Sequence, residues 1–332
     1  MNSRKSHLLF TSLLALLLAA CCSLSAFAEE EDVSLTDLDL GEVEEVSIEA
    51  PLISRPLPID FTGGFAPQES GYQGDSSYRD PTIQVDITYR DVMDYVKGYS
   101  SKNRDAGAWI VDIRIGDASQ LRTVAAESFD SNATMPVETI ADRVNAVVAF
   151  NADFVTRQDD GYVFREGILF KDKLKGKHRD VLLIDEDGDF HPFHEPKRNS
   201  LPSEIDGKKI VNAFCFGPVL VEDGEIPAKM PNFTFLKPEE YYSRLALCQV
   251  GPLHYKVIIT TMVQDYTLGL QIDSFAQLCK DEGAVIAYNL DGGYSATLYF
   301  HGIRLNNQKN INFREVPDIF YFASAWNGGD AE

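Results

Sequence analysis

Residues Asn289 to Gly302 read NLDGGYSATLYFHG, and this stretch decides the fold because two strand patterns meet in it. The run VIAYNL, which ends at Leu290, is continuously apolar up to Asn289 and predicts a buried strand. YSATLYF alternates and predicts a second strand. Asp291, Gly292 and Gly293 separate the two, and because Asp-Gly pairs favour tight turns, a plain hairpin is one interpretation.

A ligand site is the other interpretation of this stretch. Asn289 and Asp291 lie at the exit of a buried strand, where polar groups must be satisfied or used. The paired glycines Gly292 and Gly293 would let backbone N–H groups approach an anion closely. Residues with hydroxyl groups then recur at period two, on one face of the expected strand: Ser295, Thr297 and Tyr299. A carboxylate, free amides and a row of hydroxyls suit a sugar or a sugar phosphate.

Two other stretches combine a strand with polar residues in the same way. The apolar run AVVAF, residues 146–150, is followed by Asn151 and Asp153, which either cap the strand in an Asx turn or face a ligand. Arg244 precedes the apolar run LALCQV. Its guanidinium either forms a surface salt bridge or lies in a pocket, where it would bind phosphate through paired hydrogen bonds.

The region after about Asp80 alternates short strand patterns with turn signals and contains few helical patterns. Phe275, Leu278 and Cys279 have helical spacing, and Gly283 is suited to end a helix over about 273–282. A shorter helix is expected over 137–145. We therefore predict an α+β fold, with a single domain over 80–327 built on a large mixed β-sheet with few helices. Ten strands are expected in the following runs: TIQVDITYR, AWIVDIRI, AVVAF, YVFREGILF, DVLLID, AFCFGPVLV, RLALCQV, YKVIITTM, VIAYNL and ATLYF.

The N-terminal 28 residues have the pattern of a secretory signal peptide. Arg4 and Lys5 precede an apolar run over 8–20, and Ala26-Phe27-Ala28 is a small-residue cleavage site. Leu18-Ala19-Ala20-Cys21 also fits a lipobox, so a lipoprotein anchored at Cys21 and an uncleaved anchor remain alternatives to secretion. Residues 29–79 are first acidic and then rich in Pro, Gly and Ser, which predicts a disordered acidic linker. We expect a secreted or cell-envelope protein.

Charge and cysteine content restrict the partners. The net charge of −21 disfavours nucleic acid and anionic membrane surfaces, so we expect membrane contact only through a lipid anchor at Cys21. Cys215, Cys248 and Cys279 lie among apolar neighbours and are predicted to be buried thiols, although one disulfide among them is an alternative.

Five motifs in the same order resemble those of the phosphodiester glycosidase family, over roughly Val85 to Ala323. They are Asn151-Ala152-Asp153-Phe154, Gly161 with Arg165-Glu166-Gly167, Phe216 to Val221 with Asp223-Gly224, Arg244, and Asn289 to Gly293. Ala152 stands where the family has Gly. Tyr294 replaces a third Gly and Ala296 a small hydroxyl residue, and we expect Tyr294 to fill or reshape the sugar pocket.

The resemblance implies hydrolysis of a sugar-1-phosphodiester, of the N-acetylglucosamine-1-phosphate type, at the anomeric carbon. A sugar phosphate or a polysaccharide is then the expected partner, without a cofactor. Asp291 and Asp153 are the candidate catalytic carboxylates. The candidate substrate-binding residues are Asn151, Arg244, Asn289, Gly292, Gly293, Ser295 and Thr297.

Other interpretations stay open at this point. A non-catalytic protein that binds glycans on the same fold is the main alternative, and a different hydrolase on the same scaffold is another. We assign no metal ligands, because His191 and His194 have no third ligand nearby and the loop Asp185 to Asp189 lacks part of a calcium loop. Glu166 is a weaker candidate for an additional acid, and His301 a weaker candidate for lining the pocket.

Overall fold

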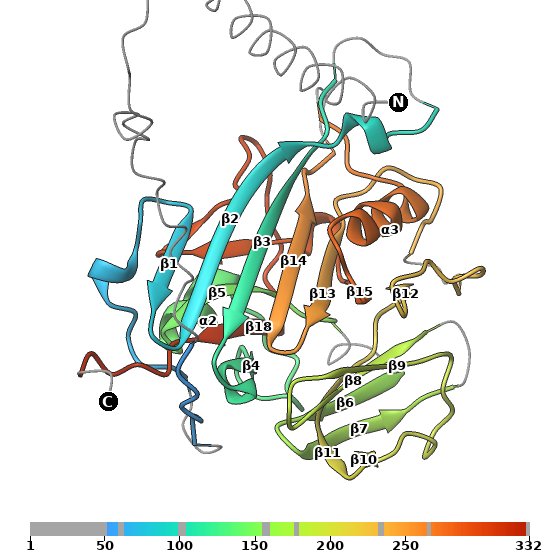
Figure 1. The fold of residues 1–332 in the computed structure, drawn as a ribbon. Coiled ribbons are helices and arrows are strands. Elements are labelled where there is room, and N and C mark those ends of the chain that lie inside the picture. Colours follow the sequence, from blue (N-terminus) through green and yellow to red (C-terminus); the bar gives the residue numbers. More distant parts are fainter. Residues whose placement is uncertain are drawn as a thin grey trace, which may run out of the picture. The chain divides into compact units, whose positions relative to one another are not determined.

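The computed structural model describes residues 52–58, 63–98, 104–154, 160–175, 179–231, 236–263 and 267–329. The expected signal peptide, Cys21 and the acidic run that begins the linker lie outside the described residues. Residues 51–332 form one compact unit (Figure 1). No helix among the described residues is both long and apolar enough to cross a membrane.

The strands form three sheets, in which every pair of strands in the described residues is antiparallel. The first sheet contains, in spatial order, β1 (Ser77–Asp80), β2 (Ile83–Asp91), β3 (Gly107–Ile115), β14 (His254–Thr260), β13 (Leu245–Gly251), β15 (Ile286–Leu290) and β12 (Val219–Val221). The second contains β17 (Ile303–Arg304), β16 (Leu298–Phe300), β5 (Ala146–Asn151), β18 (Asp318–Ala323) and β4 (Leu121–Ala125). The third contains β7 (Ile168–Lys173), β6 (Gly161–Arg165), β11 (Lys208–Phe214), β8 (Val181–Asp185) and β9 (Phe190–Phe193), with β10 (Glu204–Ile205) paired to β11.

The first two sheets pack face to face, and each carries one α-helix on its outer face. Val111 of the first sheet and Phe150 and Phe320 of the second belong to one buried core. On the opposite face of the first sheet, Ile110 packs in a core with α3 (Ile272–Asp281), and α2 (Val137–Arg143) packs against β5, β16 and β18 (Figure 1). Both faces of the central strands are therefore covered, which explains their continuous apolar runs.

The predicted α+β class with few helices is confirmed. The expected single large mixed sheet is corrected, because the described strands form three sheets whose strand pairs are all antiparallel. The helix expected over 273–282 is α3, and Gly283 follows it with φ +86°. YVFREGILF forms the two strands of a hairpin, β6 and β7. Cys215, Cys248 and Cys279 are free and buried, as expected.

The folded part begins earlier in the chain than residue 80. Of the segment interpreted as a linker, residues 52–58 and 63–79 are described, and they pack against the fold. Tyr78 is fully buried in the main core and Leu57 is 4% exposed. A pattern rich in Pro, Gly and Ser does not reveal such packing, because its few apolar residues are widely spaced.

The Asp291-Gly292-Gly293 stretch is a crossover between sheets, and the hairpin interpretation is wrong. β15 belongs to the first sheet and β16 to the second. The predicted strand YSATLYF is shortened to Leu298–Phe300, because Gly293–Ser295 form a 3₁₀ turn. The chain leaves one sheet at Leu290 and enters the other at Leu298.

The glycines allow this crossover to lie close to the chain around Ser243. A Cβ on Gly292 would lie 2.3 Å from the Ser243 carbonyl oxygen, and Gly293 adopts φ +58°. Gly292 is therefore required by close approach and Gly293 by its backbone conformation.

We expect Gly292→Ala to lower the free energy of unfolding by roughly 1–3 kcal/mol, because the new methyl group must displace backbone. Gly251→Ala is the matched control, since nothing lies within 4 Å of its added Cβ. Urea denaturation of both variants measures the difference. Equal stability of the two variants would contradict the proposed close approach.

Candidate active site

Three aspartates meet where the ends of strands converge. Asp291 directly follows β15, Asp153 follows β5 after one intervening residue, and Asp318 begins β18. The Asp291 N–H donates to the Ala152 carbonyl over 3.4 Å. The two polar strand exits recognised in the sequence therefore lie side by side.

Asn151 fixes the crossover with both ends of its side-chain amide. Its Nδ2 donates to the Asp291 carbonyl at 2.7 Å, and its Oδ1 accepts from the Thr297 N–H at 3.0 Å. The side chain is 1% exposed. We had predicted that Asn151 binds the substrate. The structure shows instead that its side chain positions other residues of the site.

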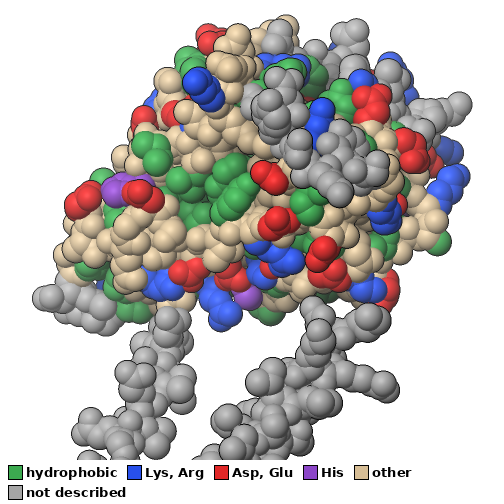
Figure 2. Space-filling model, turned by 90° about the horizontal axis from the view of Figure 1, so that it is seen from above, with side chains coloured by type: hydrophobic (Ala, Val, Ile, Leu, Met, Phe, Trp, Pro, Cys, Tyr) green, Lys and Arg blue, Asp and Glu red, His purple; other side chains and the backbone are tan. Residues whose placement is uncertain are grey.

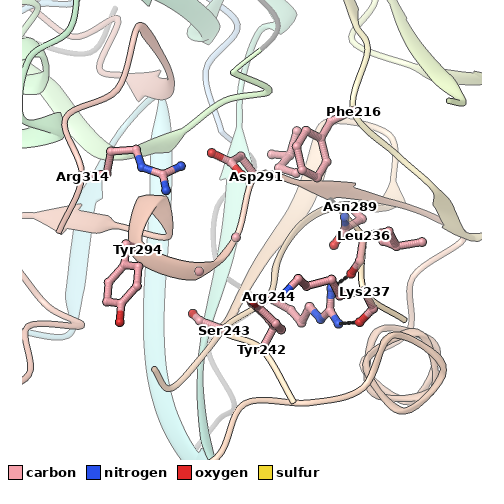
Figure 3. A pocket seen from close by; sticks show the side chains of 13 residues that line it. Phe216, Leu236, Lys237, Tyr242, Ser243, Arg244, Asn289, Asp291, Tyr294 and Arg314 are labelled. Atoms are coloured by element: carbon pink, nitrogen blue, oxygen red, sulfur yellow. Dashed lines mark hydrogen bonds between the residues drawn. The ribbon is translucent and has the colours of Figure 1, made fainter. Parts of the chain in front are cut away.

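Asp291 opens onto a pocket of about 310 Å³ (Figure 3). Arg314 extends toward Asp291 on one side, and Asn289 and Phe216 lie on the other. The lining also includes Leu236, Lys237, Tyr242, Ser243, Arg244, Leu290, Gly292, Gly293 and Tyr294. The pocket combines one carboxylate with several basic groups, an arrangement that suits a ligand with an anionic part.

The surroundings of Asp291 favour its protonated form more than water does. Burial raises its pKa to about 6, and the negative charge of Asp153 acts in the same direction. A hydrogen bond with Ser295, the positive charge of Arg314 and the Gly292 backbone oppose this rise. The carboxyl group therefore changes charge close to neutral pH.

A buried cluster lies behind Asp291. Arg165 of β6 donates from Nη2 to Asp153 at 3.1 Å and to Asp318 at 3.3 Å, and all three side chains are fully buried. Its Nη1 donates to the Ala213 carbonyl, and its guanidinium lies 3.9 Å from the ring centroid of Phe214. Asp153 also accepts from the Cys215 N–H at 2.8 Å. Asp153 is fully buried and does not line the pocket, so the structure gives no support to direct contact between this predicted catalytic carboxylate and a ligand.

Arg244 lines the pocket, but its donors bind backbone carbonyls of the preceding loop and of Leu270. Nε donates to the Leu270 carbonyl, Nη1 to Leu236 and Nη2 to Lys237 and Glu240, over 2.7–3.1 Å. Figure 3 draws the bonds to Leu236 and Lys237. Burial lowers its pKa to about 10. The expectation of a phosphate-binding fork at Arg244 is corrected, because its donors hold residues 236–240 in place.

The glycine amides are also already used. The Gly293 N–H donates to the Ser243 carbonyl at 2.8 Å, and the Gly292 backbone hydrogen-bonds the Asp291 carboxylate. The expected anion-binding pair of free amides is therefore absent from this described segment. Both glycines serve the backbone path.

The hydroxyl groups do not form one row. Ser295 is 1% exposed and accepts from Arg314 Nη1 at 3.4 Å, whereas Thr297 Oγ1 is buried without a partner. The Tyr299 hydroxyl donates to Asp142 at 2.6 Å, on the side of α2. The prediction that these hydroxyl groups share one face of a strand is wrong, because the strand begins only at Leu298.

Asn289 brings an unused acceptor to the pocket wall. Its Nδ2 donates to the Gly217 carbonyl at 2.8 Å, while its Oδ1 is buried without a hydrogen-bond partner. A buried acceptor without a partner is costly, so this oxygen is suited to accept from a ligand. The predicted binding role of Asn289 has this geometric support.

The weaker candidates lie elsewhere. Lys208 Nζ lies 3.0 Å from both Asp187 and Asp189, so an ammonium occupies the centre of the loop considered for calcium. His191 pairs with Asp185 and His194 with Glu222. No group of three potential metal-ligating side chains converges in the described ranges. Glu166 lines a separate cavity of about 460 Å³, and His301 stacks on Tyr72.

Sequence reasoning missed Arg314 and Asp318. Both lie in REVPDIFYFA, where an arginine and an aspartate flank the start of a fully buried apolar strand. Asp153 and Asp291 were identified because polar residues follow a buried strand. Here the polar residues stand at the start of the strand instead. Tyr294, by contrast, is at the pocket as expected, with 52% of its surface exposed.

Comparison with known proteins gives a consistent result. The phosphodiester glycosidase family model matches residues 144–323. The catalytic domain of zebrafish N-acetylglucosamine-1-phosphodiester alpha-N-acetylglucosaminidase, auto-inhibited by its pro-peptide, is similar with a TM-score of 0.59 and 16% identity, over 78% of this chain and 86% of that one. This likeness shows a shared fold.

A hypothetical protein from Synechocystis is similar at a TM-score of 0.49 and 15% identity, over 72% of this chain and 62% of that one. No curated protein sequence matches the chain.

We expect Arg244→Met to lower the free energy of unfolding by about 2–4 kcal/mol, because several buried carbonyls lose a charged donor. Arg314→Met, at an exposed position, should change it by less than about 0.5 kcal/mol. Denaturant unfolding of both variants measures these values. If Arg244→Met were as stable as the wild type, its donors would not be needed by residues 236–240.

Proposed function

Because the chain belongs to the phosphodiester glycosidase family, we propose that it is an exported hydrolase that cleaves the anomeric bond of a sugar-1-phosphodiester. The observation that carries this proposal is the pocket in which the Asp291 carboxylate faces the Arg314 guanidinium. A carboxylate beside an arginine suits a substrate that develops positive charge on a sugar ring and carries negative charge on phosphate.

The leaving group explains why one carboxylate at the pocket is sufficient. A phosphate monoester departs as a stable anion, so it needs less help from a general acid than an alcohol does. The sugar carbon approaches an oxocarbenium ion, which a nearby carboxylate stabilises. Ionised Asp291 acts either as the nucleophile or as the base that takes a proton from the attacking water. Both roles end with a free sugar and a phosphate monoester.

The other pocket groups divide the remaining tasks. Arg314 neutralises the phosphate, and Lys237 adds positive charge at the pocket wall. Asn289 Oδ1 accepts from a sugar hydroxyl or amide. Arg244 and Asn151 hold the loop and the crossover that shape the pocket. We take N-acetylglucosamine-1-phosphate as the sugar type, which the name of the zebrafish enzyme with the same fold supports.

We place the reaction outside the cell, on polysaccharide of the envelope or its surroundings. The basic, apolar and small-residue pattern of residues 1–28 supports export, and Cys21 supports a lipid-anchored form. The net charge of −21 makes nucleic acid an unsuitable partner. Acidic and basic side chains lie interspersed on the face of the molecule seen in Figure 2.

The direct test incubates the purified protein with an N-acetylglucosamine-1-phosphodiester and measures released reducing sugar. We expect turnover by the wild type and a loss of at least about 100-fold in Asp291→Asn, because the essential carboxylate is gone. Asp223→Asn is the matched control, since Asp223 is an exposed turn residue with φ +52° that Asn also tolerates.

The outcomes separate the candidate functions. Full turnover by Asp291→Asn would exclude Asp291 as the essential carboxylate. Binding of the sugar without turnover by any variant would favour the glycan-binding alternative.

The same enzyme should show an acid limb in its pH profile. Because burial raises the Asp291 pKa to about 6, kcat/KM should fall about tenfold per pH unit below pH 6 and level off as the pH rises from about 6 toward 7. Initial rates across this range measure the limb. A rate that instead rises as the pH falls through 6 would show that Asp291 acts as a proton donor.

A further inference from the structure

Asp318 has the poorest hydrogen bonding of the clustered carboxyl groups. Its Oδ2 lies 3.3 Å from Arg165 Nη2, and its Oδ1 is buried without a hydrogen-bond partner. The same nitrogen lies 3.1 Å from Asp153, which also receives the Cys215 N–H. One guanidinium nitrogen therefore serves two carboxyl groups, and Asp153 has the additional donor.

The charges around Asp318 do not support a second buried anion. Asp153, Arg165 and Asp291 are the charged groups that act most strongly on Asp318, and of these only Arg165 is positive. Burial raises the pKa of the nearby Cys215 thiol to about 12 and also raises that of the Tyr288 hydroxyl, so both groups are neutral. Arg314 acts on Asp291, on the side of the pocket. An ionised Asp318 would leave a charged oxygen without a hydrogen-bond donor at a fully buried position.

We propose that Asp318 is a positioning residue that must hold a proton during turnover, and that its ionisation sets the upper pH limit of the activity. The proposal rests on the proposed function and adds a residue that the family resemblance did not supply. As a neutral acid, Asp318 competes only weakly for Arg165 Nη2, so the guanidinium binds mainly to Asp153. As an anion, it competes for the shared nitrogen and places more negative charge behind Asp291.

The consequence for the substrate follows from this geometry. The chain after β5 carries Asp153 and also the Ala152 carbonyl, which accepts from the Asp291 N–H. If Arg165 binds Asp153 more weakly, the backbone at Ala152 is held less firmly, and with it the hydrogen bond that positions Asp291. Additional negative charge also opposes the approach of an anionic phosphodiester. Burial and the charge of Asp153 raise the Asp318 pKa to about 7, which agrees with the proposed limit.

The activity test compares the pH profiles of kcat/KM for wild type and Asp318→Asn. We expect the two to agree within about threefold near pH 6, because Asn mimics the neutral acid. Above about pH 7 the wild type should decline while Asp318→Asn should not, which gives the variant an advantage of about tenfold by pH 8. A loss of 100-fold or more in the variant near pH 6, or the same alkaline decline in both proteins, would overturn the proposal.

A second measurement needs no substrate. A carboxyl group whose pKa is raised on folding stabilises the fold below its ordinary value of 3.8, and this contribution is lost as the pH rises through about 7. The difference in Tm, variant minus wild type, should therefore become more positive for Asp318→Asn as the pH rises from 5 to about 8. A constant Tm difference would show that Asp318 does not titrate there and would overturn the proposal.

The two measurements distinguish the possible failures. If the Tm difference changes as expected but no sugar is released at any pH, the proposed function fails, and the positioning role fails with it. If sugar is released and the Tm difference is constant, only the role of Asp318 fails.

Discussion

The guanidinium of Arg165 is the interaction on which the site depends. It comes from the third sheet and joins Asp153 and Asp318, which belong to the end and the start of strands in the second sheet. Without a cation at this point, two buried carboxyl groups would face each other with no water to screen them. Stacking on Phe214 and donation to the Ala213 carbonyl hold the cation in place. Removing it would leave uncompensated buried charge, which is more costly than losing a surface ion pair.

Arg165 also explains how one carboxylate comes to face the pocket. Asp153 is committed to Arg165 and the Cys215 amide, and its charge helps to raise the pKa of Asp291. The crossover after β15 then turns Asp291 toward Arg314. Buried charged groups that influence Asp291 thus lie behind the pocket residues that would contact the ligand, at the junction of three sheets. This division matches the need of glycosidic chemistry for carboxyl groups with separate roles.

Much of this could be predicted from the sequence, and the failures have a common cause. Strand exits at Asn151 and Leu290 were visible because apolar runs end abruptly in polar residues, and the structure brings them together. The use of Gly293 was not predictable, because its partner, the Ser243 carbonyl, is distant along the chain. The use of Arg244 was not predictable either, because its partners are backbone carbonyls, which no residue pattern marks, although three of them lie only 4 to 8 positions before it. Arg314 and Asp318 carried a readable signal, but it came before a strand instead of after one. Polar residues at strand ends indicate where a site lies. Tertiary contacts then decide which of these polar groups remain available to a ligand.

The separation of the cluster along the chain has a consequence for folding. Arg165 and Asp318 are 153 positions apart, and Asn151 and Asp291 are 140 apart. Contacts of such long range cannot form until large loops have closed, so sheets of this kind fold slowly. The contacts of Arg165 with the two aspartates can be removed from water only when all three sheets have docked. The chain therefore acquires its site in the last stage of assembly, and a partly folded molecule would have secondary structure without the charge arrangement that the reaction needs.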